Sequence, residues 1–336
     1  MYFQQILLDL FSKLNGERSS MAPYYILRGK KSGQTLQDIH YYQATFYFGI
    51  APDLTKEVYQ QEVDQLFTNY WVTNEDEPKL TQRGQRELES FIEPMYSYAT
   101  NSVLGEFEKR VLLLTQVASN RLAHIPTYYP VILDEIIQRD CKRLIHLLGG
   151  VDKTSLQLKT VIGEFLEKTG QQEEVKMIFV YRLTGYESAG LTWTQLGEQL
   201  NLRPLDALFK YRSLLAEFAT YLLQNESEIA VIVPKSELLT ETARKTLEWY
   251  TKGHNFHEIA SIRRLKESTI EDHFVEIASA RPDLSFNEIL TEEQVREILC
   301  VRKELDTHKL KSLREQLPHY SYFQLRLALA KGEIIS

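Results

Sequence analysis

The fold is decided by residues 256–274, which read FHEIASIRRLKESTIEDHF. The spacing of small and apolar residues predicts two helices joined by a tight turn, with Ala260 where the helices cross and Ser268 as the N-cap of the second helix. Arg264 stands where such turns usually have glycine, which costs about 1 kcal/mol if that residue needs a positive φ. The stretch therefore predicts a helix-turn-helix. Its buried contacts are expected from Ile259, Leu265 and Ile270.

Charged side chains of both signs surround this motif. Three cations precede the second helix, where they would face a DNA backbone together with the helix N-terminus. Three acidic residues on the second helix weaken a phosphate-binding surface, and residues 241–336 hold 15 basic against 16 acidic residues. The alternative is a helix-turn-helix that serves packing or protein contact. The candidate DNA-contacting residues are Arg263, Arg264, Lys266, Ser268, Thr269 and His273.

The whole chain has an ordinary globular composition. Its 336 residues are 43 % apolar and 25 % charged, which excludes intrinsic disorder as the main description and predicts two or three domains. The 46 acidic and 39 basic residues give a formal net charge of -7. No apolar run is long enough to span a membrane, and the start lacks the pattern of a signal peptide. With two distant cysteines, Cys141 and Cys300, the sequence predicts a cytoplasmic protein without a disulfide framework.

The N-terminal part of the chain is expected to be a winged-helix-like domain. The apolar stripe over residues 3–14 predicts a first helix, the capping-box pattern over residues 35–38 predicts the start of a second, and a third begins near Thr55. Residues 70–73 and 79–81 are expected to form the two short strands of a wing. The alternative is a helical bundle with one irregular loop.

A second group of cations precedes the helix expected at Thr35. These cations are interleaved with Tyr24 and Tyr25, and aromatic rings among cations can stack on unpaired bases. The alternative is a basic loop with core tyrosines. The candidate DNA-contacting residues of this group are Arg18, Arg28, Lys30 and Lys31.

Helical periodicity continues through the rest of the chain and gives the domain organisation. Residues 96–233 are predicted to be a helical middle region, with a possible second helix-turn-helix at 191–215 that resembles a sigma-type region. A break in the periodicity over residues 225–235 marks the boundary before an all-helical domain at 234–336. The expected fold class is therefore mostly α: a winged-helix-like domain over 1–95, the helical middle region, and a C-terminal helix-turn-helix domain.

Motifs of catalysis and cofactor binding are nearly absent. His257 and Glu258 begin an HExxH zinc pattern, but Ser261 stands where the second histidine is needed. Residues 29–32 resemble the end of a P-loop, but Tyr24 stands where the first glycine is needed. No nucleophile elbow, dinucleotide fingerprint or paired-carboxylate signature occurs. The sequence predicts a non-enzyme without a cofactor or structural metal.

Both ends of the chain resemble the YpbB family, whose C-terminal region is similar to the helicase helix-turn-helix domain of many RecQ-family helicases. At the C-terminal end, the resemblance is carried by Thr246, Leu247, Tyr250, residues 257–260, residues 265–274, residues 320–322 and residues 325–328. At the N-terminal end, it is carried by residues 15–19, residues 27–38, Leu80, Thr81 and Gly84. The helicase motor motifs are absent from the sequence, and the middle matches only in length and helical character.

This resemblance implies an accessory protein that binds DNA and acts with a RecQ-type helicase in DNA repair or recombination, because the two genes are commonly neighbours. It implies that the chain supplies in trans a domain that some helicases carry in their own chain. Two alternatives stay open: a helix-turn-helix transcription regulator, and an interaction scaffold without DNA contact. The oligomeric state is open as well.

Overall fold

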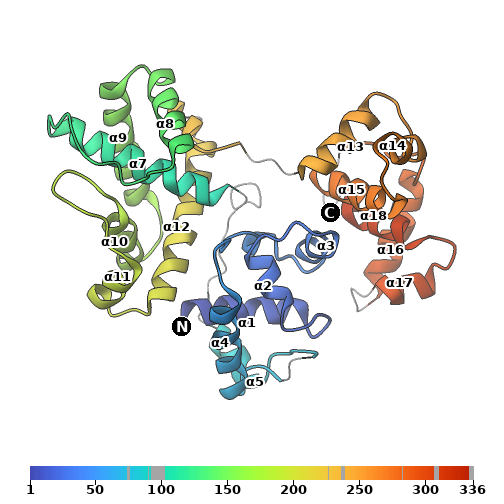
Figure 1. The fold of residues 1–336 in the computed structure, drawn as a ribbon. Coiled ribbons are helices and arrows are strands. Elements are labelled where there is room, and N and C mark those ends of the chain that lie inside the picture. The colour runs from blue at the N-terminus through green and yellow to red at the C-terminus, as the bar shows by residue number, and fades with distance from the viewer. Residues whose placement is uncertain are drawn as a thin grey trace. The chain divides into compact units, whose positions relative to one another are not determined.

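The chain is mostly helical, as the sequence predicts (Figure 1). Within the described ranges there is no strand, and two isolated β-bridges occur. The computed structural model describes residues 1–73, 76–89, 91, 103–225, 227–235, 239–281, 283–305 and 310–332.

The helices of the first half are α1 (Tyr2–Leu14), α2 (Ala22–Leu27), α3 (Gly33–Tyr41), the 3₁₀ helix η1 (Thr45–Tyr47), α4 (Lys56–Thr68), α5 (Gln82–Leu88), α7 (Leu104–Leu122), α8 (Glu135–Leu147) and α9 (Val151–Lys168). Those of the second half are α10 (Glu173–Arg182), α11 (Trp193–Leu200), α12 (Pro204–Gln224), the 3₁₀ helix η2 (Glu228–Ile232), α13 (Glu241–Thr251), α14 (Phe256–Arg263), α15 (Glu267–Ala280), α16 (Glu292–Glu304), α17 (Leu310–Gln316) and α18 (Tyr322–Gly332).

The start of α4 is confirmed, and the start of α3 is corrected. The Thr55 hydroxyl accepts a hydrogen bond from the Val58 N–H at 3.3 Å, just before α4. The predicted capping residue Thr35 instead lies inside α3 and is buried, because α3 already begins at Gly33. The Ser32 hydroxyl accepts from the Thr35 N–H at 3.4 Å. An earlier hydroxyl therefore takes the role that the sequence gave to Thr35.

The expected wing is not confirmed. The segments over 70–73 and 79–81 meet in one antiparallel bridge, between Val72 and Leu80. The Thr73 N–H donates to the Lys79 carbonyl at 2.9 Å, so the two segments do run side by side. No further bridge forms between these segments among the described residues, so they do not make a two-stranded hairpin next to the helices.

The internal contacts divide the chain into two compact units. Unit 1 comprises Met1–Leu8, Phe46–Val58 and Arg86–Ser236. Unit 2 comprises Asp9–Thr45, Tyr59–Gln85 and Glu237–Ser336. Segments from the N-terminal third belong to both units. Each unit is assembled from separate segments, whereas the domains expected at 1–95, 96–233 and 234–336 are consecutive stretches of the chain. Those three domains stay a prediction.

Unit 1 is built on an aromatic core between long helices. Helix α7 packs along α9, and α10 and α11 pack on α12. The Phe218 ring of α12 lies 4.9 Å from the Phe165 ring of α9 and 5.8 Å from the Phe179 ring of α10, measured between ring centres. All three rings are buried, so these contacts fix how the helices of this unit pack.

The pair of helices expected at 191–215 is formed by α11 and α12. The Thr192 hydroxyl accepts from the Gln195 N–H in a capping box, and Asn201 ends α11 in the left-handed conformation with φ 53°. A Cβ on Gly197 would lie 2.7 Å from a backbone oxygen of the turn, so the helices approach closely there. Helix α12 is largely buried, which makes this pair part of the core of unit 1.

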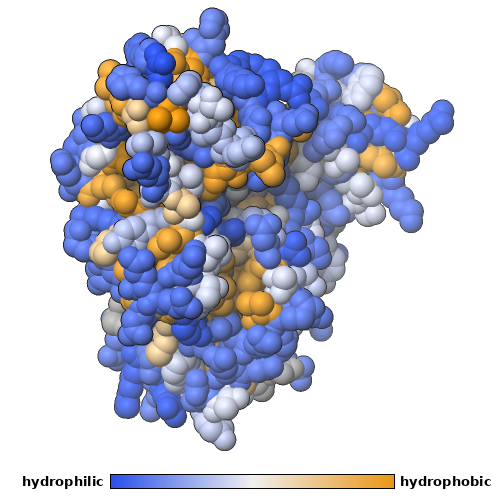
Figure 2. All heavy atoms as spheres, turned by 60° about the vertical axis from the view of Figure 1, so that its left-hand side comes forward, coloured by the Kyte–Doolittle hydropathy of each residue, from blue (hydrophilic) through white to orange (hydrophobic). Residues whose placement is uncertain are grey.

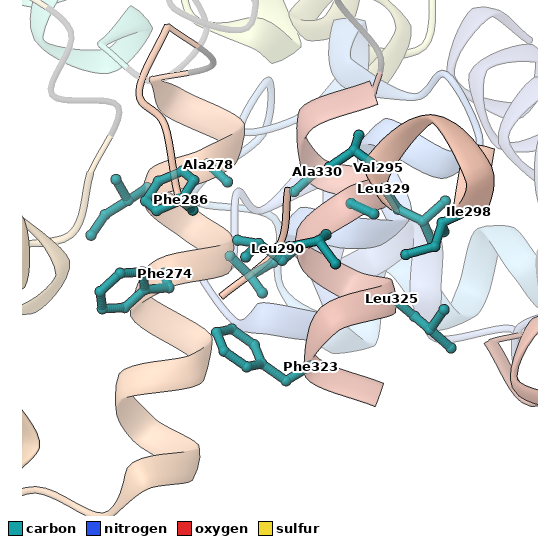
Figure 3. Close-up of a cluster of buried hydrophobic side chains, with 14 of the residues drawn as sticks. Phe274, Ala278, Phe286, Leu290, Val295, Ile298, Phe323, Leu325, Leu329 and Ala330 are labelled. Atoms are coloured by element: carbon teal, nitrogen blue, oxygen red, sulfur yellow. The ribbon is translucent and has the colours of Figure 1, made fainter. Parts of the chain in front are cut away.

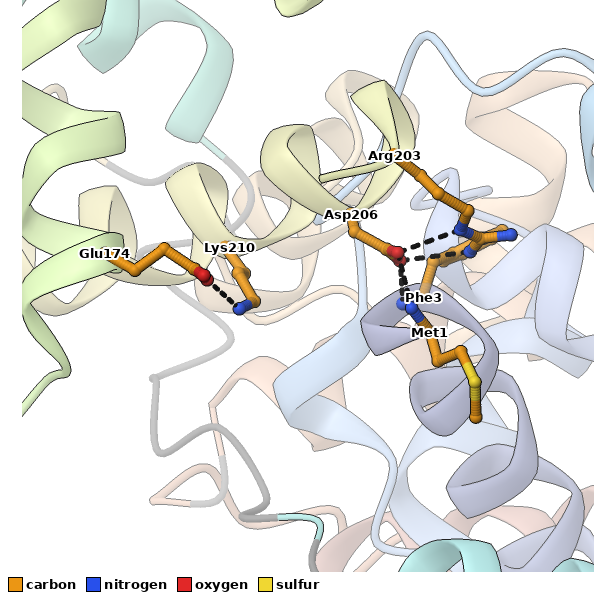
Figure 4. A network of polar contacts seen from close by, with 6 residues as sticks. All are labelled: Met1, Phe3, Glu174, Arg203, Asp206 and Lys210. Carbon is orange, nitrogen blue, oxygen red and sulfur yellow. Dashed lines mark hydrogen bonds and ion pairs between the residues drawn. The ribbon is translucent and has the colours of Figure 1, made fainter. Parts of the chain in front are cut away.

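Asp206 at the start of α12 is a buried carboxylate that ties the chain's first residues to that helix (Figure 4). It accepts hydrogen bonds from the Met1 amino group at 2.5 Å, the Phe3 N–H at 2.9 Å and Arg203 Nε at 2.8 Å. Burial alone raises the pKa of such a carboxyl, but these hydrogen bonds outweigh it and lower the pKa of Asp206 to about 2. On the same helix, Lys210 forms an ion pair with Glu174 of α10.

Replacing Asp206 with asparagine is expected to lower the free energy of unfolding by about 2 kcal/mol at pH 7. The folded-state pKa lies below the unfolded one, so this stabilisation is present above pH ~4 and is lost as the pH falls towards 2. Urea denaturation of both proteins from pH 7 to pH 2.5 measures the difference. A difference that does not shrink on acidification would contradict the assigned role of Asp206.

Unit 2 joins the six C-terminal helices, α13 to α18, to helices from the N-terminal part. One apolar cluster contains Phe274 of α15, Leu290 of the segment before α16, and Phe323 of α18 (Figure 3). Tyr41 at the end of α3 and the following Tyr42 are buried in the same core. Helix α3 packs on both α15 and α18. Tyr41 and Tyr42 of the N-terminal part therefore share one hydrophobic core with the C-terminal helices.

Candidate nucleic-acid interface

The helix-turn-helix consists of α14 and α15 and has the left-handed turn residue that the sequence suggested. Arg264 has φ 51° and ψ 42°, and its side chain is exposed. The Leu265 N–H donates to the Ala260 carbonyl at 3.1 Å, which closes the end of α14. Asn255 and Glu258 form a capping box at the start of that helix. The expected N-cap is wrong: α15 begins at Glu267, so Ser268 lies within its first turn.

Replacing Arg264 with glycine is expected to leave the free energy of unfolding unchanged or to raise it by up to about 1 kcal/mol. Glycine removes the steric cost of an arginine with positive φ, although it also increases the conformational entropy of the unfolded chain. Arg264→Ala is the matched control, because it removes the same charge and keeps the backbone cost. Thermal denaturation ranks the two variants. An Arg264→Gly protein less stable than Arg264→Ala would contradict the turn geometry.

Helix α15 presents little of its length to solvent. Its residues from His273 to Ala278 are all buried, because α13, α18 and α3 pack around it. Among its earlier residues, Glu267, Ser268 and Asp272 are exposed, and Thr269 is half-buried. A recognition helix reads base edges through exposed side chains near its N-terminus. In α15, the surface that DNA could reach is limited to the first one and a half turns, and the charged side chains there are negative.

Two of the expected DNA contacts are committed to internal packing. Arg263 Nη1 donates to the Thr242 carbonyl at 2.7 Å and also to the Thr246 hydroxyl of α13. His273 Nδ1 lies 2.9 Å from the same hydroxyl and 3.2 Å from Arg263 Nη1. Burial lowers the pKa of His273, and the charge of Arg263 lowers that pKa further. Arg263 and His273 therefore hold α13 against α15, and their role in DNA contact stays a prediction.

Arg18 is likewise used inside unit 2. Its guanidinium forms an ion pair with Asp38 of α3 at 2.8 Å and lies 5.2 Å from the centre of the Tyr42 ring. Its Nη1 donates to the Glu17 carbonyl at 2.8 Å. Burial raises the pKa of Asp38, and the hydrogen bond from Arg18 acts against that rise. Arg18 thus anchors α3 through Asp38, and its assignment as a DNA contact stays a prediction.

The remaining expected cations are exposed on two loops of unit 2. In the loop between α2 and α3, Lys30 Nζ lies 4.2 Å from the centre of the Tyr25 ring, which is 37 % exposed. The Arg28 guanidinium donates to the Tyr24 hydroxyl at 3.2 Å. The exposed cations are Arg28, Lys30 and Lys31 in this loop, and Arg264 and Lys266 in the turn before α15.

The structure places the loop between α2 and α3 beside the helix-turn-helix, which sequence reasoning missed. Burial raises the pKa of Glu276 on α15, and the charge of Lys31 in the loop acts against that rise. A Cβ on Gly33 would lie 2.9 Å from Arg326 Nη2 and 3.2 Å from Asp272 Oδ1, two side chains that form an ion pair at 2.6 Å. No local pattern signals such a contact, because its partners lie more than two hundred residues apart.

The described residues contain no cluster of three side chains suited to a metal ion. His257, from the incomplete zinc pattern, lies beside a carboxylate instead, with its Nδ1 2.9 Å from Glu267. The neighbouring His254 does the same, with its Nδ1 3.5 Å from Glu258. None of the helices in the described ranges is long and apolar enough to cross a membrane.

Comparison with known proteins fits this arrangement. Residues 242–329 match the model of a helix-turn-helix domain family. This range runs from the start of α13 to the last turn of α18. Protein YpbB of Bacillus subtilis (strain 168) is 30 % identical over 344 aligned residues, which span 98 % of this chain and 97 % of that protein. No solved structure matches the chain significantly. The chain belongs to the YpbB family.

Proposed function

We propose that this chain is a non-catalytic, DNA-binding accessory protein that acts with a RecQ-type DNA helicase in DNA repair or recombination. The proposal is carried by the match of residues 242–329 to a helix-turn-helix domain family, on a chain whose sequence has no motor motif. The resemblance of this region to the helicase helix-turn-helix domain supports the choice of partner. A domain of this kind without its own motor needs a partner to take part in unwinding. Such a protein works in the cytoplasm, and its two free cysteines suit a reducing compartment.

DNA contact in this proposal is made to the phosphate backbone by the two exposed loops. Their cations, with the ring of Tyr25 beside Lys30, suit phosphates and an unpaired base. Base reading is not expected, because the second helix is mostly buried. Affinity is therefore weak and depends little on sequence. The winged-helix interpretation of residues 1–95 stays part of this proposal and is supported by the bridge between Val72 and Leu80.

One alternative has a specific observation in its favour. The exposed part of α15 carries Glu267 and Asp272, and acidic side chains there suit a protein partner better than DNA. That observation favours an interaction scaffold without DNA contact. A transcription regulator is less well supported, because it requires an exposed recognition helix.

Association with the cognate RecQ-type helicase tests the proposal. The purified pair is expected to co-elute in size-exclusion chromatography, and the chain is expected to change the rate at which the helicase unwinds a forked duplex. The Lys30→Ala/Lys31→Ala variant serves to separate the two contacts, since it should still co-elute without DNA. Absence of co-elution together with an unchanged unwinding rate would refute the helicase role.

A further inference from the structure

Helix α8 of unit 1 and the segment before it expose large apolar side chains to an unusual degree. Leu133 is 79 % exposed, Ile136 64 % and Leu147 68 %, and Tyr129 just upstream is 95 % exposed. Single exposed apolar residues are ordinary, but several on one short segment indicate a contact surface. Figure 2 shows hydrophobic side chains that reach the surface between hydrophilic ones.

The backbone under these side chains is held in place. Gln116, a buried residue of α7, donates to the Tyr129 carbonyl at 2.9 Å and accepts from the Val131 N–H at 2.8 Å. Gln138 of α8 donates to the Ile132 carbonyl at 2.8 Å. The opposite face of α8 is buried through Ile137, Cys141 and Leu144. The exposed side chains therefore stand on a fixed frame, which reduces the entropy lost when a partner binds.

The same side of α8 carries cations with few internal partners. Arg139 and Lys142 are exposed and form neither an ion pair nor a hydrogen bond within the described residues. Arg143 lies 3.4 Å from Asp140, but Arg110 also shares that carboxylate. Some exposed cations of unit 1 have an acidic partner, such as Arg121 with Asp152 and Lys153 with Glu228, whereas others, such as Lys159, have none among the described residues. Exposed Glu135 lies on the same side, one turn before Arg139, so three cations stand against one exposed carboxylate and the α8 face is locally positive on a chain of net charge -7.

We propose that this α8 face is a docking site for an acidic amphipathic helix of a partner protein. The face is defined by Leu133, Ile136, Arg139, Lys142, Arg143 and Leu147. The occupant follows from charge complementarity and apolar exposure together. Carboxylates of the partner pair with the cations, and its apolar stripe covers the three aliphatic side chains. DNA would neutralise the cations but leave the apolar side chains in water. The inference concerns unit 1 and does not depend on DNA contact by unit 2.

A matched pair of double variants tests the proposal on the full chain. Lys142→Glu/Leu147→Ser changes the α8 face. Lys159→Glu/Leu156→Ser makes the same chemical changes on exposed positions of α9, where Leu156 is 58 % exposed. The probes are an 18-residue helical peptide of glutamate and leucine, a counterpart of lysine and leucine, and a duplex of 20 base pairs. Fluorescence anisotropy measures binding, and hydrogen exchange locates it.

The acidic peptide is expected to bind and to protect residues 129–147 from exchange. The α8 variant should weaken this binding at least about tenfold, since reversing one charge and removing one apolar contact each cost about 1 kcal/mol or more. The α9 variant should bind as the wild type does. Protection of 129–147 by the basic peptide or by the duplex would overturn the proposal. So would self-association of the chain that the α8 variant abolishes, or failure of the acidic peptide to protect this segment.

Discussion

Replacing Tyr41 with alanine is expected to lower the free energy of unfolding of unit 2 by about 3 kcal/mol. The side chain is 3 % exposed and lies in the core that the N-terminal part shares with the C-terminal helices. The guanidinium of Arg302, on α16, lies 5.9 Å from the centre of the Tyr41 ring and loses that contact as well. Hydrogen exchange of the α15 amides, measured at increasing urea concentrations, reports the free energy of unfolding of this unit.

Tyr322→Ala is the matched control for this prediction, because Tyr322 lies in the same unit and is 51 % exposed. Its loss should cost less than about 0.5 kcal/mol, as is usual for surface substitutions. Equal effects of the two variants, or exchange rates in α15 that Tyr41→Ala does not change, would show that α3 is not part of the C-terminal core.

Elements with strong local signals could be predicted from the sequence. Helices α14 and α15, and the left-handed Arg264 between them, follow from apolar spacing and from one residue at a glycine position. The capping box at Thr192 is another local signal that the structure confirms. These features depend on residues within about ten positions of one another, so periodicity and capping rules suffice.

The N-cap predictions failed where two local signals competed. Thr35 has a capping pattern, but the hydroxyl of Ser32 precedes it and α3 begins at Gly33. Ser268 was expected to open α15, but the left-handed end of α14 lets the chain enter the next helix at Glu267. In both cases the helix starts earlier than the pattern indicates.

The roles of individual cations could not be predicted, because burial is a property of the tertiary structure. Arg263 and Arg264 are neighbours in the sequence, yet one is held by Thr246 of α13 and the other is exposed. Arg18 and Lys30 precede the same helix, yet one pairs with buried Asp38 and the other lies over an exposed ring. Each distinction depends on a contact to another element that composition and spacing do not encode.

DNA binding by the two exposed loops should show in the salt dependence of affinity. Contacts to about four to six phosphates give a slope of about -4 to -5 in a plot of log affinity against log salt. Lys30→Ala/Lys31→Ala is expected to flatten this slope by up to about two units, because each lost phosphate contact removes close to one. Arg264→Gly/Lys266→Ala tests the other loop, and the two effects should nearly add if both loops touch one DNA.

The control is Arg244→Ala/Lys245→Ala on α13, where each cation already pairs with a glutamate of the same helix at 2.7 Å. The deciding measurement is the salt titration of the full chain and these three variants on a forked duplex. A flatter slope is expected for each loop variant, and an unchanged slope is expected for the control. Unchanged slopes in both loop variants, with folding intact by circular dichroism, would contradict DNA contact and would assign the chain to the scaffold class.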